Sequence, residues 1–276
     1  MNALPPGLSA QHYRAVFISD THLGTRGCRT DFLADFLRRM SCERLYLVGD
    51  IIDGWRLRRS WYWDDAHDEV VRLIVRHARN GAEVVYIPGN HDEMLRSWLT
   101  LGLEVAGVRL ASEATHVTAD GRRLLVIHGD EFDSVVRYAR VLAVLGDHAY
   151  NAALVINRWF NIGRRWFGYP YWSLSAWAKR QVKEAVKAID RFENALTGEA
   201  IRRGFDGVVC GHIHQAEMRE VNGVLYLNDG DWVESCTAVV EHHDGRLELI
   251  DWAALNRLSF FMRPTGRHSA RLPEAV

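Results

Sequence analysis

The chain of 276 residues is 48% hydrophobic and 25% charged, a composition typical of a globular protein with a sizeable core. Its formal net charge of −1 excludes a strongly basic surface overall, so no nucleic-acid partner is expected. The four cysteines lack a CxxC spacing, which indicates buried thiols in a reducing compartment: Cys28, Cys42, Cys210 and Cys236. The chain has neither a signal-peptide pattern nor an apolar stretch of roughly 18 residues, so a cytoplasmic location is expected.

Short apolar runs alternate with helical stretches along the first half of the chain. Residues 13–19, 44–48 and 83–88 are predicted to be strands, and residues 64–80 a helix that stops at Asn80-Gly81. The second half is rich in strands, several of them separated by Asp-Gly or Asn-Gly pairs: 115–119, 122–128, 206–210, 224–228, 237–241 and 247–252. This order predicts an α/β protein in which two sheets stack with helices on the outside.

One long stretch interrupts the strands. Residues 133–198 contain no convincing strand, are predicted to be helical throughout, and carry nine aromatic residues between Trp159 and Phe192. Such an insertion between two strands is typical of a lid over the sandwich. We therefore predict one domain over residues 12–256 that includes this lid, with flexible tails at 1–11 and 263–276.

Polar clusters follow five of the apolar runs. Because loops at the carboxyl ends of strands converge on one crevice in an α/β sheet, these clusters are expected to form one site. In chain order they are Asp20-Thr21-His22, Gly49-Asp50-Ile51-Ile52-Asp53, Gly89-Asn90-His91-Asp92, His128-Gly129-Asp130 and Gly211-His212-Ile213-His214.

The side chains in these clusters are those of a metal site. Carboxylates, imidazoles and one amide without any thiolate suit Mn, Fe or Zn, and do not suit a structural zinc site of the cysteine type. Two ions need a bridging carboxylate, and Asp50 stands in the middle of the set. Asp92, in contrast, is expected to cap the helix that follows it.

In this order the five clusters resemble the motifs of the calcineurin-like metallophosphoesterase superfamily: D-x-H, G-D-x-x-D, G-N-H-D/E, a lone His and G-H-x-H. The resemblance covers about residues 13–252. It implies a four-layer α/β/β/α sandwich of two mixed sheets with a helical insertion. It also implies two divalent metal ions, most simply Mn, and hydrolysis of a phosphorus–oxygen bond by a metal-activated water.

The resemblance also assigns roles to individual residues. One ion would be held by Asp20, His22, Asp50 and His214, and the other by Asp50, Asn90, His128 and His212. His91 would stabilise the transferring phosphoryl oxygens or protonate the leaving group, and Asp53 would orient His91. Ions roughly 3.5–4 Å apart would clamp the phosphate for in-line attack, without any covalent intermediate on the protein.

Longer stretches such as LVGDIIDGW, PGNHDE, PYWSLSAW and NDGDWVES are similar to the UDP-2,3-diacylglucosamine pyrophosphatase-like family. This resemblance implies a lipid A pathway type of reaction on a lipid-linked nucleotide and a peripheral position at the inner membrane. The lipid A branch carries Arg where this chain has His91, which leaves a paralogue acting on another nucleotide or phospholipid phosphoester as the alternative. A non-catalytic scaffold is a further alternative, disfavoured because no ligand has been lost.

The end of the predicted lid carries a cationic stripe. Arg180, Lys183, Lys187 and Arg191 recur at helical spacing opposite an apolar face of Val182, Ala185, Val186, Ile189, Phe192 and Leu196. An ordinary solvated helix face is one interpretation. Because the stripe is all positive, we instead predict that Lys179, Arg180, Lys183 and Lys187 bind a phosphorylated or lipid-linked substrate, or an anionic membrane surface.

Overall fold

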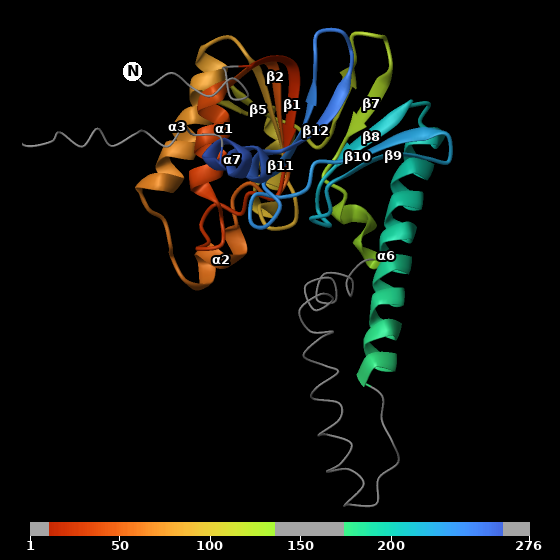
Figure 1. The fold of residues 1–276 in the computed structure, drawn as a ribbon. Coiled ribbons are helices and arrows are strands. Elements are labelled where there is room, and N and C mark those ends of the chain that lie inside the picture. Colours follow the sequence, from red (N-terminus) through yellow and green to blue (C-terminus); the bar gives the residue numbers. More distant parts are fainter. Residues whose placement is uncertain (1–10, 136–173, 262–276) are drawn as a thin grey trace, which may run out of the picture.

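The computed structural model describes residues 11–135 and 174–261. It has two mixed sheets packed face to face with helices outside them (Figure 1). This confirms the predicted four-layer arrangement. Among the helices in these two stretches, none is long and apolar enough to cross a bilayer.

The first sheet has seven strands in the order β12-β11-β1-β2-β3-β5-β4. Its centre is parallel, since β1, β2, β3 and β5 all run the same way, while β11, β12 and β4 are antiparallel to their neighbours. The strands are β1 (Gln11–Ile18), β2 (Met40–Val48), β3 (Glu83–Ile87), β4 (Glu104–Val105), β5 (Val108–Leu110), β11 (Thr237–Glu241) and β12 (Leu247–Asp251).

The second sheet has five strands in the order β6-β7-β8-β10-β9. Here β7, β8 and β10 are parallel, and the edge strands β6 and β9 are antiparallel to their neighbours. The strands are β6 (Ala114–Val117), β7 (Arg123–Val126), β8 (Gly207–Cys210), β9 (Glu217–Val221) and β10 (Val224–Asn228).

Three apolar layers hold these elements together, one at each interface of the sandwich. Phe17, Tyr46 and Leu227 belong to the layer between the two sheets. A second layer packs the first sheet against α1 (Thr30–Arg39), α3 (Asp65–Arg79) and α7 (Trp252–Phe261). A third packs the second sheet against α6 (Leu174–Arg202). The four cysteines are buried free thiols, as predicted.

The helices follow from ordinary sequence signals. The carboxylate of Asp64 accepts the amides of Ala66 and His67 and caps α3, whose buried residues recur at helical spacing. Two short elements flank the site: α2 (Gly54–Arg59) follows β2, and the 3₁₀ helix η1 (Glu93–Leu101) follows β3. A second 3₁₀ helix, η2 (Asp130–Val135), follows β7.

Part of the predicted lid is the long helix α6, which continues past residue 198 to Arg202. Residues 136–173 lie outside the described part of the chain, as do most of the two predicted tails. The buried apolar residues of α6 are Ala188, Phe192, Leu196 and Ala200, four residues apart. Val186, on the apolar face identified from the sequence, is 50% exposed. The N-terminal part of α6 projects beyond the second sheet (Figure 1).

Candidate metal centre

The five polar clusters meet at one end of the sandwich. Asp20, Asp50 and Asn90 follow the parallel strands β1, β2 and β3, and His128 and His212 follow the parallel strands β7 and β8. The carboxyl ends of both parallel regions therefore face one another across the interface between the sheets. The predicted convergence of the loops is confirmed.

The backbone at this end adopts a conformation that L-residues seldom take. Five of the eight non-glycine residues with positive φ in the described chain are predicted ligands: Asp20 (49°), His22 (49°), Asp50 (52°), His212 (70°) and His214 (54°). A left-handed residue costs about 1–3 kcal/mol and persists only where its surroundings enforce it. Such strain concentrated in one cluster is typical of a functional site.

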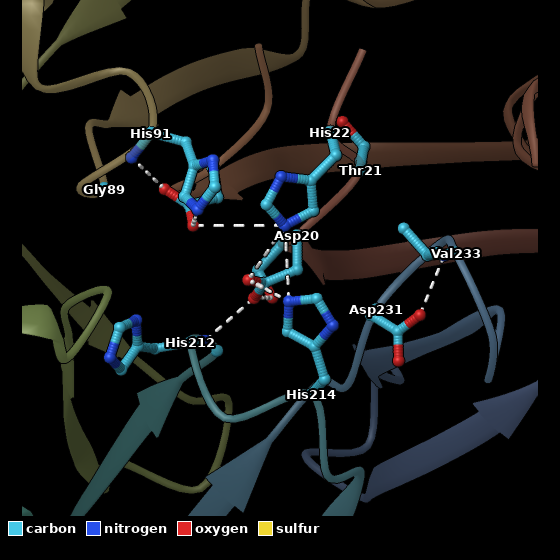
Figure 2. Close-up of polar contacts among 12 residues, drawn as sticks. Asp20, Thr21, His22, Gly89, His91, His212, His214, Asp231 and Val233 are labelled. Carbon is cyan, nitrogen blue, oxygen red and sulfur yellow. Dashed lines mark hydrogen bonds and ion pairs between the residues drawn. The ribbon is translucent and has the colours of Figure 1, made fainter. Parts of the chain in front are cut away.

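Asp20, His22 and His214 form the first ligand group. His214 Nε2 lies 2.9 Å from Asp20 Oδ1, and His22 Nε2 lies 3.7 Å from the same oxygen. Figure 2 shows both imidazoles directed toward Asp20. The second carboxylate oxygen, Oδ2, accepts the backbone amide of His212 at 2.8 Å and the hydroxyl of Ser19 at 2.6 Å. The carboxylate is thereby fixed with Oδ1 toward the imidazoles.

Asp50, His128 and His212 form the second group, and their ligand atoms all lie within 4.8 Å of one another. His128 Nδ1 donates to the carbonyl of Val48 at 2.8 Å, which leaves Nε2 to face Asp50 Oδ2 at 3.5 Å. A hydrogen bond of this kind fixes the tautomer of a metal-binding histidine.

Asp50 lies between the two groups. Its Oδ2 is 3.5 Å from His128 Nε2 and 4.0 Å from His22 Nε2, while its Oδ1 accepts the amide of His91 at 2.8 Å. Asn90 Oδ1 is buried and has no hydrogen-bond partner among the described residues. A buried polar atom without a partner is costly, and a cation would satisfy it. The donors present therefore fit a pair of divalent ions.

His91 and Asp53 lie beside this centre. His91 Nδ1 is 3.1 Å from Asp53 Oδ1, and His22 Nδ1 is 3.4 Å from Asp53 Oδ2. His91 Nε2 is 3.9 Å from Asp50 Oδ2. One carboxylate thus contacts both His91 and a predicted ligand, a link that the motif spacing did not reveal.

The charges of the cluster shift its titration. Burial disfavours the charged forms, but the neighbouring carboxylates Asp20 and Asp53 raise the pKa of His22 to about 9. For His128 burial is likewise outweighed, and Asp50 raises its pKa to about 10. In turn, despite burial, His128 lowers the pKa of Asp50 to about 2. Without metal, protons on the imidazoles therefore compensate the buried carboxylates.

Asp92 does not cap the helix after it, contrary to expectation. Its carboxylate makes no capping hydrogen bond and points back toward the site loops. Oδ1 accepts the amide of Gly89 at 2.5 Å, and Oδ2 accepts the amide of Ile51 at 2.9 Å and the hydroxyl of Tyr86 at 2.5 Å. It ties the loop of Asp50 to the loop of Asn90 because several buried amides there need an acceptor.

Two further contacts were not predicted. Ser19 Oγ lies 2.5 Å from Asp229 Oδ1 and links that buried carboxyl to Asp20. Burial raises the pKa of Asp229 well above its usual range. The ring of Trp55 lies on the imidazole of His91, with ring centroids 4.4 Å apart. The GDIIDGW stretch contains Trp55, but its position gives no signal that the indole contacts His91.

The predicted substrate residues lie on α6 and not within the ligand groups. Lys183 and Lys187 are exposed, and the side chains of Lys179 and Arg180 lie outside the part that the structure describes. Further along α6, the ring of Phe192 lies 6.0 Å from that of His212. At 1.5 Å per residue, Lys187 and Lys183 come about 8 and 14 Å before Phe192 along the helix. α6 thus borders the centre and extends away from it.

The fold and these paired ligand groups define a metal-dependent phosphoester hydrolase. The chain belongs to the calcineurin-like phosphoesterase family, whose family model matches residues 13–216. The family identified from the motifs is confirmed.

The chain is similar to proteins named UDP-2,3-diacylglucosamine hydrolases. It is 22% identical to that of Haemophilus influenzae (strain PittGG) over 245 residues, which cover 82% of this chain and 93% of the relative. The identity to the Neisseria meningitidis serogroup B (strain ATCC BAA-335 / MC58) protein is 24% over 234 residues, which cover 79% of this chain and 89% of the relative. A shorter match to the Aliivibrio fischeri (strain MJ11) protein is 30% identical over 122 residues, which cover 42% of this chain and 47% of the relative. A solved archaeal phosphodiesterase aligns with a TM-score of 0.41 and 15% identity, covering 86% of this chain and 98% of that one.

Proposed function

We propose that this enzyme hydrolyses the pyrophosphate bond of a lipid-linked nucleotide of the UDP-2,3-diacylglucosamine type. The observation that carries the proposal is the pair of ligand groups that meet at Asp50. The choice of substrate is supported by the similarity to UDP-2,3-diacylglucosamine hydrolases, which extends over 93% of the length of one relative.

In this proposal each group holds one divalent ion, most simply Mn²⁺. Asp20, His22, Asp50 and His214 are the ligands of the first ion, and Asp50, Asn90, His128 and His212 those of the second. Bound there, the ions would supply an activated water and a clamp for the phosphate oxygens. The oxygen and nitrogen donors suit Mn²⁺, and Fe²⁺ and Zn²⁺ remain compatible with them.

His91 acts on the substrate and not on the ions. Its Nδ1 faces Asp53, so its Nε2 is the atom available to stabilise a phosphoryl oxygen or to protonate the leaving group. Asp53 keeps the ring in this orientation. Its own pKa is depressed despite burial, because the imidazoles of His22 and His91 stabilise the carboxylate.

His91 also supports a second candidate, a paralogous activity on another nucleotide or phospholipid phosphoester. Cleavage of a pyrophosphate releases a phosphate group that needs little protonation, whereas an ordinary ester releases an alkoxide that needs a proton. A histidine can donate that proton, and the arginine of the lipid A branch cannot. A non-catalytic scaffold is disfavoured because all the ligand positions are occupied by suitable donors.

A panel of substrates with Mn²⁺ distinguishes these candidates. Faster turnover of UDP-2,3-diacylglucosamine than of phosphodiesters and phosphomonoesters would support the first candidate, and the reverse order would support the second. His91→Arg serves as the matched variant. This substitution is expected to lower turnover less on the pyrophosphate substrate than on a monoester. An equal loss of turnover on both substrates would remove the argument drawn from His91.

We further propose that the insertion acts as a lid and brings the enzyme to an anionic membrane surface, as a peripheral protein of the inner membrane. Lys183 and Lys187 are exposed on α6, and the N-terminal part of this helix projects beyond the sandwich (Figure 1). Lys183→Glu with Lys187→Glu is expected to abolish sedimentation with anionic liposomes and to raise KM for long-chain substrates only. Arg202→Glu, at the other end of α6, is the matched control. Equal kinetics of the parent on long and short chains, without liposome binding, would contradict the lid.

A further inference from the structure

One tripeptide at the start of α2 contacts His91 in three ways. Asp53 Oδ1 lies 3.1 Å from His91 Nδ1, and the amide of Gly54 donates to the carbonyl of His91 at 3.0 Å. The indole of Trp55 lies over the imidazole, with centroids 4.4 Å apart and planes inclined by 35°. The edge, the backbone and one face of His91 are thus held by consecutive residues.

Trp55 is itself fixed to the segment that carries His91. Its Nε1–H donates to Glu93 Oε1 at 3.3 Å, and Glu93 opens η1 two residues after His91. A side chain on Gly54 would meet both the carbonyl of His91 and the side chain of Met94, so glycine permits this close approach. The start of α2 and the segment from His91 to Glu93 are therefore joined by the contacts of Gly54 and Trp55.

The environment of His91 explains why such a contact matters. His22 packs edge-on against its ring at 4.6 Å, with planes inclined by 84°. Trp55 makes a second, flatter ring contact, and 17% of the His91 side chain is exposed. Without the indole, this imidazole would have room to rotate out toward solvent. Misplacement of a catalytic group by about 1 Å can cost roughly 100-fold in rate.

We propose that Trp55 is a positioning residue that keeps His91 Nε2 directed at the bond being cleaved. The inference rests on the proposed role of His91 as a group that acts on substrate. Trp55 is 42% exposed, so its indole lies at the surface beside His91 and is not part of the apolar core. It stabilises the orientation of the ring through packing and does not itself touch the reacting atoms.

The test compares aryl phosphodiesters that release p-nitrophenolate with those that release phenolate, a poorer leaving group. If His91 protonates the leaving group, displacement of its imidazole lowers kcat more for the substrates that release phenolate, because phenolate needs the proton more than p-nitrophenolate does. Trp55→Ala is expected to lower kcat for phenolate release about 30-fold and for p-nitrophenolate release several-fold less, with metal content and KM unchanged. Trp55→Phe should restore most of the loss. Trp61→Ala removes an indole that is 76% exposed and should leave kcat unchanged.

A double-mutant cycle separates positioning from general destabilisation. In the His91→Ala background, Trp55→Ala is expected to cause no further loss of kcat, because the imidazole that Trp55 positions is absent. A full additional loss of kcat, or loss of metal from Trp55→Ala, would overturn the inference. An equal loss of kcat on both leaving groups, in Trp55→Ala and His91→Ala alike, would assign His91 to the phosphoryl oxygens and keep Trp55 as its positioning residue. Impaired His91→Ala with fully active Trp55→Ala would overturn the positioning role alone. Fully active His91→Ala would overturn the proposed role of His91 as well.

Discussion

We expect metal binding and pH to be coupled through two histidines of the candidate centre. In the metal-free protein the pKa of His22 is raised to about 9 and that of His128 to about 10, so both are protonated at pH 7.5. An imidazole must be neutral to bind a metal ion, and binding therefore expels the proton. We expect loading of both ions at pH 7.5 to release about two protons from these side chains.

The size of the pH effect follows from this count. Each expelled proton makes the apparent affinity rise about tenfold per pH unit as long as the pH stays below the pKa of that histidine. Between pH 6.5 and 8.5 both histidines stay in that regime. The product of the two apparent association constants is therefore expected to rise about 100-fold per unit.

The same pKa shifts make the stability of the fold depend on pH, in opposite directions for the metal-free and the metal-loaded protein. In the metal-free fold both pKa values lie above the unfolded value of about 6.5, so the contribution is fully present below pH 6.5. It is lost as the pH rises through 9 for His22 and 10 for His128. The Tm of chelated protein should therefore fall over this window. In the metal-loaded form the imidazoles are neutral, so its Tm should rise as the pH rises through about 6.5.

Titration calorimetry provides the measurement. Mn²⁺ is added to chelator-treated protein at pH 7.5 in buffers of different ionisation enthalpy, and the slope gives the number of protons released. His242→Ala, which removes a histidine of the β11–β12 turn that belongs to no candidate ligand group of the described residues, is the control and should release as many protons as the parent. Zero release, or an affinity independent of pH between 6.5 and 8.5, would refute the coupling.

Three substitutions test other parts of the centre. Asp50→Asn should weaken both ions together and lower activity by orders of magnitude without unfolding; two ions per chain with normal turnover would exclude the bridging role. His91→Ala should lower turnover by roughly 10²–10⁴-fold with metal content intact, and loss of one ion would make His91 a ligand instead. Asp92→Ala leaves the amides of Gly89 and Ile51 without their acceptor. This substitution should lower Tm by several degrees in thermal unfolding and metal affinity roughly 10–100-fold in metal analysis. An unchanged Tm together with an unchanged metal affinity would show that Asp92 does not brace the loops.

The architecture was predictable because its signals are local. Alternation of apolar runs with helical spacing indicated two sheets with helices outside, and turn pairs marked the strand ends. The polar clusters after Ile18, Val48 and Ile87 converge because β1, β2 and β3 are parallel neighbours, so their carboxyl ends share one edge. The apolar face of α6 was recognised from its spacing, but spacing alone did not distinguish Val186, which is 50% exposed, from Phe192 and Leu196, which are buried against the second sheet.

The types of the predicted ligands and their order along the chain were thus determined by the sequence itself, because each motif lies within a few residues. The tertiary structure decided how those side chains are held, because the supporting contacts join distant segments. Asp92 braces the Asp50 loop across 41 residues instead of capping its own helix, since the buried amide of Ile51 needs an acceptor. Ser19 meets Asp229 across 210 residues, and Trp55 meets His91 only because α2 and η1 pack together. No local pattern encodes such pairings, since side-chain spacing constrains only neighbours in the same element.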